Sequence, residues 1–304
     1  MEILYLLEKI RTPWLNQLMI WVTQIGSEMF LMVAALVILW CVNKKWGYYL
    51  LLVSSLGTTV NQFLKNYFMV PRPWVKDPSF TIVEEARAGA TGYSFPSGHT
   101  QSATGFLGGM ARISTKKRYR FFFIFLVLLV GFSRMYLGVH TFQDVAVSWL
   151  IGTLLVIILY PLLNTQEKNI YPVMLTGVLL ALGHVIFMEV KTSGLLELDE
   201  VTLDGLKNAY TCLGLAMSIP LIYYIDQKYL NYDTAGVWWV QLLKCIGGLG
   251  LMLAIRVLLK EPLLLLTNGH QSADLVRYFL MAMAGGALWP KTFKWFNRLA
   301  APKH

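Results

Sequence analysis

Charged residues are scarce in this chain of 304 residues. Asp, Glu, Lys and Arg together make up 14% of it, whereas a soluble domain carries about 25%. A shortage on this scale excludes an ordinary water-soluble domain. Cysteine is scarce as well, because only Cys41, Cys212 and Cys245 occur, all in or beside apolar runs. Their spacing fits neither a metal site nor a disulfide framework.

The chain also lacks the features of a cleaved secretory signal. Residues 1–4 contain neither a basic region nor a small-residue cleavage site, so we expect no removed signal peptide. Hydrophobic residues, by contrast, make up 56% of the chain, and the mean hydropathy is +0.53. Aromatic residues reach 13% and include 10 Trp, which suits belts at the two membrane interfaces. These values predict an all-α, polytopic membrane helical bundle.

The formal net charge of +9 does not require a nucleic-acid partner. In a membrane protein, excess Lys and Arg mark cytoplasmic loops and contact anionic lipid headgroups. We therefore expect membrane lipids as partners and no nucleic acid. The sequence leaves the oligomeric state open.

Apolar runs that can cross a bilayer, which takes about 20 residues, recur along the chain. An amphipathic segment over residues 3–14 precedes them and suits a helix lying on the membrane surface. We expect about nine spans in two domains, with the surface helix and a five-span core in residues 1–163 and a four-span extension in residues 164–304. The expected spans are an apolar region that ends at residue 42 and is broken at Gly26-Ser27-Glu28, then residues 46–64, 98–113, 121–135, 144–163, 171–190, 206–225, 237–259 and 275–288.

Basic residues divide unevenly between the loops that join these spans. The densest cluster, residues 112–120, falls on the same side as the C-terminal tail if nine spans are right. The positive-inside rule makes that side cytoplasmic. The loop 65–95 and the acidic segment 197–204 then lie on the extracytoplasmic or lumenal side, with the N-terminus outside and the C-terminus inside. The other basic residues on the cytoplasmic side are Lys44, Lys45, Lys291, Lys294, Arg298 and Lys303.

The stretch Tyr93-Ser94-Phe95-Pro96-Ser97-Gly98-His99-Thr100 stands between a polar loop and an apolar run of small residues. Pro96 and Ser97 suit the start of a helix, and Gly98 lets an anion approach the backbone closely. A helix that begins here points its free N–H groups and the positive end of its dipole at the loop. His99 adds a side chain that exchanges protons near neutral pH. The stretch predicts a phosphate-sized site with a proton donor beside it.

Two further stretches supply cations and a candidate nucleophile. Arg72 follows Lys65 by seven residues, and two cations at a membrane edge can hold one phosphate, although positive charges also flank spans without any further role. Arg134 leads to His140 and Asp144, whose i,i+4 spacing puts them on one face if the segment is helical. A carboxylate beside a histidine fixes its tautomer and leaves the other ring nitrogen free to attack.

Taken together, the three stretches resemble the type 2 phosphatidic acid phosphatase family, whose core is shared with the vanadium haloperoxidases. The family pattern is Lys, six residues, Arg-Pro; then Pro-Ser-Gly-His; then Ser-Arg, five residues, His, three residues, Asp. Residues 65–73, 96–99 and 133–144 match every fixed position in order. The resemblance covers residues 25–163, and glucose-6-phosphatase and sphingosine-1-phosphate phosphatases are similar in having further helices after that core.

The resemblance implies a membrane phosphatase that needs neither a metal nor another cofactor. It implies that His140 attacks phosphorus to form a phosphohistidine, and that Asp144 orients His140. It implies that His99 protonates the leaving oxygen and then activates water. The phosphoryl oxygens would be held by Lys65, Arg72, Ser97, Gly98 and Arg134. Phosphoryl transfer depends mainly on positioning and charge stabilisation, which three cations and a helix N-terminus provide.

Several functions remain open on the sequence. The leading one is hydrolysis of a lipid phosphate: a phosphatidate-like lipid, an isoprenoid diphosphate, phosphatidylglycerophosphate or a sphingoid phosphate. The alternatives are a phosphatase for a soluble ester such as a sugar phosphate, and a non-catalytic lipid-binding or transport protein on the same core. Among the ionisable residues of the later spans, Glu189 and Arg256 suit snorkelling at span ends. His184 and Lys244 fit a substrate pocket and helix packing equally well.

Overall fold

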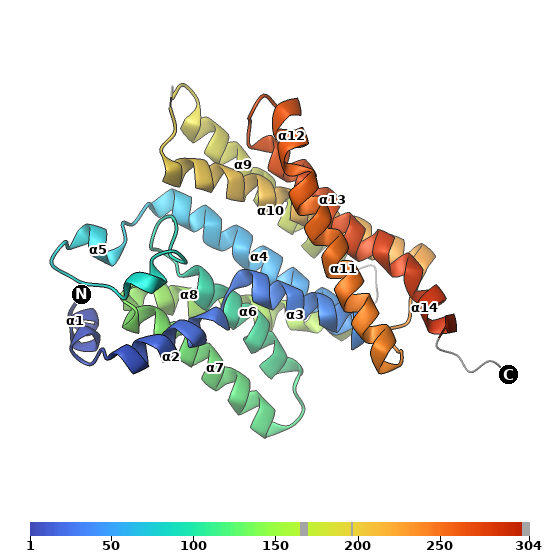
Figure 1. Cartoon of the computed structure of the whole chain (residues 1–304), viewed down its shortest axis with the longest axis horizontal. Helices are drawn as coiled ribbons and strands as arrows, with labels where there is room; N and C mark the ends of the chain where they lie inside the picture. The colour runs from blue at the N-terminus through green and yellow to red at the C-terminus, as the bar shows by residue number, and fades with distance from the viewer. Residues whose placement is uncertain (165–169, 196, 300–304) are drawn as a thin grey trace. The chain divides into compact units, whose positions relative to one another are not determined.

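The computed structural model describes residues 1–164, 170–195 and 197–299, and every regular element among them is a helix (Figure 1). The predicted all-α class is therefore confirmed. Lys303, which the sequence assigns to a basic tail, lies outside the described residues.

The chain divides into two compact units. The first consists of residues 1–32, 56–161 and 191–205, and it contains all three motif stretches. The second consists of residues 33–55, 162–190 and 206–304. The helices of the first unit are α1 (Glu2–Lys9), α2 (Pro13–Gln24), the later part of α4 (Lys44–Phe68), α5 (Pro73–Lys76), α6 (Gly98–Ile113), α7 (Lys117–Tyr136) and α8 (Phe142–Leu159).

The N-terminal segment forms two helices rather than the single surface helix expected over residues 3–14. Thr12 caps α2 by accepting from the backbone N–H of Leu15, and Pro13 occupies its first position. Proline favours that position because it has no N–H to leave unpaired there. After α2, the chain bends by 44° into α3 (Glu28–Cys41). This bend lies at the Gly26-Ser27-Glu28 break seen in the sequence.

Five helices are long and apolar enough to cross a membrane, or six if α2 and α3 form one broken span. The structure therefore does not confirm nine spans among the described residues. Three of the expected spans, residues 46–64, 98–113 and 275–288, are not among these candidates. The last of them falls on α13 (Ser272–Met283), which has only 12 residues. Helix α4 has the length but carries polar residues at both ends, and α6 has only 16 residues, many of them Gly, Ser and Thr. The longest candidate spans each consist of two consecutive helices, for example α11 (Trp238–Leu258) followed by α12 (Lys260–Leu266).

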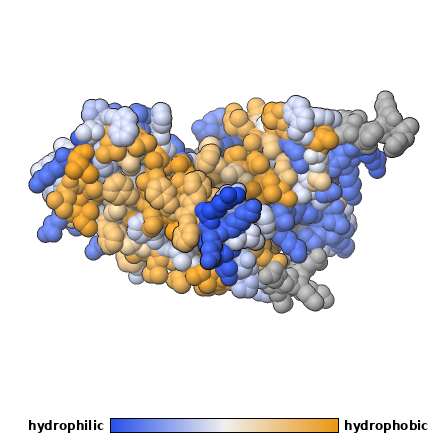
Figure 2. Space-filling model, turned by 90° about the horizontal axis from the view of Figure 1, so that it is seen from below, coloured by the Kyte–Doolittle hydropathy of each residue, from blue (hydrophilic) through white to orange (hydrophobic). Residues whose placement is uncertain are grey.

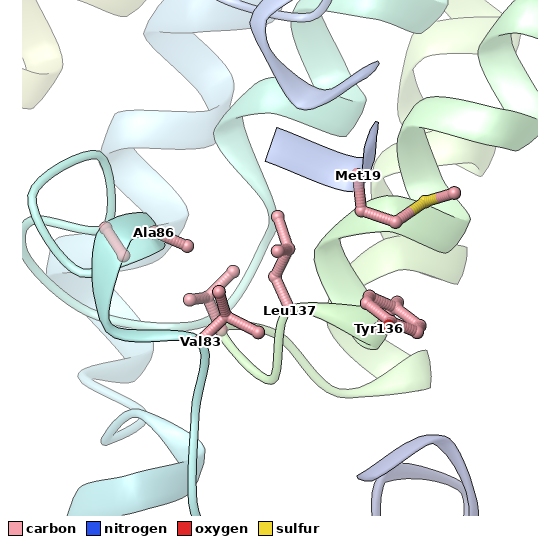
Figure 3. Close-up of a cluster of buried hydrophobic side chains, with 7 residues drawn as sticks. Met19, Val83, Ala86, Tyr136 and Leu137 are labelled. Atoms are coloured by element: carbon pink, nitrogen blue, oxygen red, sulfur yellow. The ribbon is translucent and has the colours of Figure 1, made fainter. Parts of the chain in front are cut away.

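Helix α6 is the centre of the first unit, because it packs against both α7 and α8. The loop after α7 is held by a hydrophobic cluster in which Tyr136 and Leu137 meet Met19 of α2 and the segment around Val83 and Ala86 (Figure 3). Every residue of this cluster is buried. The cluster fixes the backbone at the end of α7, and five residues separate this point from the start of the next helix.

Arg11, between α1 and α2, ties the N-terminal segment to the same loop. Its Nε donates to the carbonyl of Tyr136 (3.0 Å), and its Nη1 donates to the carbonyl of Thr81 (2.8 Å). Gly138 follows with φ +81°, and a Cβ there would lie 2.7 Å from Nη2 of Arg11. Only glycine suits both the backbone angle and the space.

The second unit contains α9 (Tyr171–Thr192), α10 (Glu200–Ile225), α13 (Ser272–Met283) and α14 (Phe293–Leu299), along with α11 and α12. The fully buried Asp226 accepts hydrogen bonds from Lys44 and Tyr48, both at 3.1 Å. The sulfur atoms of Cys41 and Cys245 lie 3.7 Å apart, within hydrogen-bond distance, and form no disulfide. The sequence spacing gives no sign of that approach.

Candidate active site

The first part of the site is the start of α6. Ser97 caps this helix, accepting from the backbone N–H of Thr100 at 3.4 Å, and its hydroxyl lies 2.9 Å from that of Thr100. Gly98 and His99 are the first two helical residues. The predicted helix, residues 98–113, has the bounds of α6. Its free N–H groups and the positive end of its dipole therefore lie at the motif, as expected.

The second part is the start of α8, where Asp144 has two structural tasks. Its Oδ2 accepts from the backbone N–H of Thr141 (2.7 Å), while the Thr141 hydroxyl accepts from the N–H of Asp144, which completes a capping box. The same Oδ2 accepts from the hydroxyl of Ser94 at 2.6 Å. The helix begins at Phe142, so His140 lies just before it and the helical condition for the i,i+4 spacing is not met. The cap stops the helix short of His140 and brings Asp144 back toward it.

His140 is almost fully buried, and its two ring nitrogens have different neighbours. Nδ1 lies 3.4 Å from Oδ2 of Asp144, an ion-pair distance rather than an aligned hydrogen bond. Nε2 lies 2.9 Å from Nη1 of Arg72. Guanidinium nitrogens only donate, so Nε2 accepts and the ring proton belongs on Nδ1, facing the carboxylate. The nitrogen opposite Asp144 therefore carries a lone pair, as a nucleophile requires.

The electrostatics keep this imidazole neutral. The pKa of His140 lies well below its ordinary value, first because burial disfavours the charged ring and then because Arg72, Arg134 and Lys65 place positive charge nearby. Burial also lowers the pKa of Arg72 to about 10, with part of that fall offset by Asp144. Arg72 thus stays charged at neutral pH while His140 does not.

Arg72 is held by the loop around it. Nε donates to the carbonyl of Gly92 (3.0 Å), Nη1 to that of Val139 (3.0 Å) and Nη2 to that of Thr91 (2.6 Å). These bonds join the segments before α6 and after α7. Arg72 is therefore both a cation at His140 and a tie between two loops.

The other two predicted cations lie in the same unit and are buried. Nζ of Lys65 donates to the carbonyl of Tyr93 at 2.6 Å. Nη1 of Arg134 donates to the hydroxyl of Thr23 at 2.9 Å, but its Nε and Nη2 are buried and have no hydrogen-bond partner among the described residues. Buried N–H groups of a cation are costly to leave unpaired. Arg134 therefore has unused donors suited to an anion.

The structure brings the side chains of Arg72, His140 and Asp144 into contact. Ser97 is joined to this group through the backbone, because its N–H donates to the carbonyl of Asp144 at 3.1 Å. His99 forms no hydrogen bond or ion pair with these side chains in the described part of the chain. Ser94 and Thr23 were missed in the sequence. The position of Ser94 within the stretch 93–100 could have indicated a role in the site. Nothing in the sequence around Thr23 indicates its contact with Arg134.

Two buried amides beside the motif were missed too. Asn61, one helical turn before Lys65, and Gln101, in the first turn of α6, have side-chain oxygens and nitrogens without hydrogen-bond partners in the described residues. A Cβ on Gly98 would lie 3.9 Å from Oδ1 of Asn61. Because a buried amide without a partner is costly, these groups suit contact with water or a polar ligand beneath the start of α6.

For Lys244, the sequence fits a substrate pocket and helix packing equally well, and the observed contacts are those expected of helix packing. It is fully buried, its Nζ donates to the carbonyl of Ala235 at 3.0 Å, and it lies 4.9 Å from the centre of the Phe293 ring. His184 is fully buried within α9.

A helical membrane protein with these motifs around a buried histidine has the features of a membrane phosphatase, and comparison with known families agrees. The model described as PAP2 superfamily matches residues 45–168, and the model described as PAP2 superfamily phosphatase, transmembrane extension, matches residues 210–302. The chain belongs to the PAP2 superfamily and is an integral membrane hydrolase of phosphate esters.

Curated relatives include several lipid phosphatases. Phosphatidylglycerophosphatase B of Bacillus subtilis is 32% identical over 48% of this chain and 74% of its own length. A dihydrosphingosine 1-phosphate phosphatase of Schizosaccharomyces pombe is 30% identical over 48% of this chain, but the match covers only 38% of that protein. Undecaprenyl-diphosphatase of Sulfolobus acidocaldarius is 28% identical over 46% of this chain and 66% of its own length. No solved structure matches the chain.

Proposed function

We propose that this protein removes phosphate from a phosphorylated lipid through a phosphohistidine on His140. The observation that carries the proposal is the arrangement at the imidazole: Nδ1 faces Asp144, and Nε2 accepts from Arg72. This arrangement leaves a neutral ring with its lone pair among buried cations. Such a site suits attack on a phosphorus whose oxygens those cations neutralise.

The reaction has two transfers. A phosphoryl group enters, Arg72 moves its Nη1 donor from Nε2 to a phosphoryl oxygen, and Nε2 forms a bond to phosphorus. His99 takes up a proton from solvent when the negatively charged phosphoryl group enters. The bond to the leaving oxygen then breaks, and His99 gives that proton to the leaving oxygen. His99 then takes a proton from water, the water oxygen bonds to phosphorus, and the phosphorus–nitrogen bond breaks to release phosphate. Asp144 stabilises the ring when it carries positive charge.

Four other groups would hold the phosphoryl oxygens. Arg134 offers its two unused donors, and Lys65 contributes a point charge. Ser97 and Gly98 offer the N-terminus of α6. We further propose that residues 1–163 form the catalytic core and residues 164–304 a membrane extension, which the matches at 45–168 and 210–302 support.

A lipid substrate is favoured over a soluble ester because the curated relatives are named as phosphatases of lipid phosphates: phosphatidylglycerophosphate, dihydrosphingosine 1-phosphate and undecaprenyl diphosphate. The direct test is phosphate release by detergent-purified protein from a panel of these lipid phosphates and of sugar phosphates. We expect release from at least one lipid and little from the sugar phosphates. Turnover of sugar phosphates alone would instead favour the soluble-ester alternative, and no turnover by folded protein would favour a binding protein.

Turnover should survive removal of divalent metal. The charges that the reaction needs are those of Lys65, Arg72 and Arg134, and no group of three or more His, Cys, Asp or Glu residues in the described ranges could hold a metal ion. We expect unchanged phosphate release in excess chelator, and inhibition by vanadate, which resembles pentacoordinate phosphorus. Complete loss in chelator with recovery on adding Mg²⁺ would contradict a metal-independent mechanism.

We also propose that the site faces away from the cytoplasm. Helix α6 separates two loops of different charge: residues 112–120 hold five basic residues and no acidic one, whereas residues 65–95 hold four basic and three acidic residues. Two of those four, Lys65 and Arg72, have a proposed role in catalysis. The positive-inside rule then puts the loop 112–120 in the cytoplasm.

Single cysteines at Ser79 and at Thr115, each exposed, test this orientation on a background without the three native cysteines. We expect an impermeant maleimide to label the Ser79→Cys variant in intact cells and the Thr115→Cys variant only after permeabilisation. The reverse pattern would put the site in the cytoplasm. Labelling of both in intact cells would mean that α6 does not separate the two sides as proposed.

A further inference from the structure

A groove lies on the first unit at the end of α6 remote from the motif. It has a volume of about 720 Å³ and is formed by α6, α7 and α8. Helices α7 and α8 both pack on α6, and between them small residues of α6 such as Gly108 and Ala111 form its floor. Ile124, Leu128 and Ile157 are exposed at its sides. The groove is thus apolar along most of its length and open.

Two arginines, Arg112 and Arg120, line the same groove. The Arg112 guanidinium lies 3.9 Å from the centre of the Tyr160 ring, and Arg120 donates to the carbonyl of Ser114 at 3.1 Å. The segment 112–120 holds five basic residues and no acidic residue, and none of the five forms an ion pair in the described part of the chain. In Figure 2 the connection between α6 and α7, the lowest part of Figure 1, forms a compact hydrophilic patch among hydrophobic surface.

The dimensions of the groove fit one acyl chain. Its lining on α8 runs from Ile157, toward the arginine end, to Trp149, which is eight residues or roughly 12 Å of helix. Half of a bilayer's hydrocarbon core is about 15 Å thick. At Trp149 the ring turns inward, with Nε1 donating to the carbonyl of Val127 at 3.4 Å.

This groove is separate from the candidate active site. His99 and Arg112 are thirteen residues apart on the same helix, so roughly 20 Å of α6 lies between them. His140 lies between the end of α7 and the start of α8, near the start of α6. A phosphate at Arg112 therefore cannot reach it. The lipid that reacts and a lipid in this groove would be different molecules.

We propose that the groove binds one anionic phospholipid, with its phosphate between Arg112 and Arg120 and an acyl chain directed toward Trp149. The positive charge at one end and the apolar length behind it are complementary to such a lipid. Neither a zwitterionic lipid nor an apolar protein helix would neutralise the two arginines.

The test is native mass spectrometry of the full chain in detergent, after incubation with phosphatidylglycerol or phosphatidylcholine of identical chains. We expect the wild type to retain phosphatidylglycerol preferentially, and Arg112→Ala/Arg120→Ala to lower that retention roughly tenfold. The matched control, Lys116→Ala/Arg118→Ala, removes two charges from the same segment without touching the groove. It should retain the lipid as the wild type does. All four side chains are exposed, so folding should tolerate both variants.

A second variant tests the acyl chain alone. A Cβ at Gly108 would make ordinary contact with Val156 at 3.6 Å, so Gly108→Leu would extend into the groove and should lower retention with both arginines intact. Equal retention by the two double variants, or equal retention of the two lipids, would overturn the proposal. Displacement of the lipid by inorganic phosphate would show a phosphate site instead. None of these measurements depends on turnover, so their failure leaves the proposed function untouched.

Discussion

Replacing His140 with Ala should abolish phosphate release while the protein remains folded. In the described site, only the imidazole of His140 has contacts that direct a lone pair toward the buried cations. Without this ring no phosphohistidine can form. We expect a fall of roughly 10⁴-fold or more, as for removal of the nucleophile in other covalent mechanisms. The measurement is phosphate release by purified variant and wild type, with folding followed by thermal unfolding.

A matched control is available for the histidine. His270 is exposed, lies in the second unit and contacts Glu189, so His270→Ala should leave turnover close to wild type. Appreciable phosphate release by a well-folded His140→Ala variant would remove His140 from the role of nucleophile. Trapping a phosphorylated protein with wild type but not with this variant would support the covalent step directly.

The second large effect is expected for Asp144→Asn. The amide oxygen can still accept from Thr141 and Ser94, so the start of α8 should survive. That oxygen takes the place of Oδ2 and still faces Nδ1 of His140, but it carries no negative charge. The ring that becomes positively charged on attacking phosphorus then lacks its counter-charge, so kcat should fall by up to roughly 10⁴-fold.

Two comparisons separate this effect from loss of structure. Asp144→Ala also removes the capping box and should lower thermal stability, by about 1 kcal/mol for the cap alone. Glu84→Gln, at an exposed carboxylate paired with Arg87, is the control for loss of one negative charge. Near wild-type kcat in Asp144→Asn would mean that the reaction does not need the negative charge of the carboxylate.

The helix of the motif was predictable because its signals are local. Proline, serine and glycine in that order specify a helix start whatever the rest of the chain does, and the bounds 98–113 followed. The grouping of Arg72, His140 and Asp144 was also available, through family resemblance rather than through distance. The i,i+4 argument for His140 and Asp144 depended on a helical segment that does not form, because Thr141 caps the helix after His140 and a spacing alone does not reveal where a helix begins.

Other features of the site depend on contacts that no local pattern encodes. The carbonyls that hold Arg72 come from residues 91, 92 and 139, and they meet it only because two loops fold together. The hydroxyl partner of Arg134 comes from residue 23, more than a hundred positions away. Nine spans are not confirmed because helix length and apolar content diverge: α4 is long but polar at its ends, and α6 is short.

The bond from Arg11 to the loop after α7 has a practical consequence for anyone who handles the protein. The first twelve residues carry none of the proposed catalytic groups, yet Arg11 holds the carbonyl of Tyr136, four positions before the proposed nucleophile. Trimming this segment would release one side of the loop that positions His140. A purification tag is therefore better placed at the other end of the chain, and an inactive truncated preparation would say nothing against the chemistry.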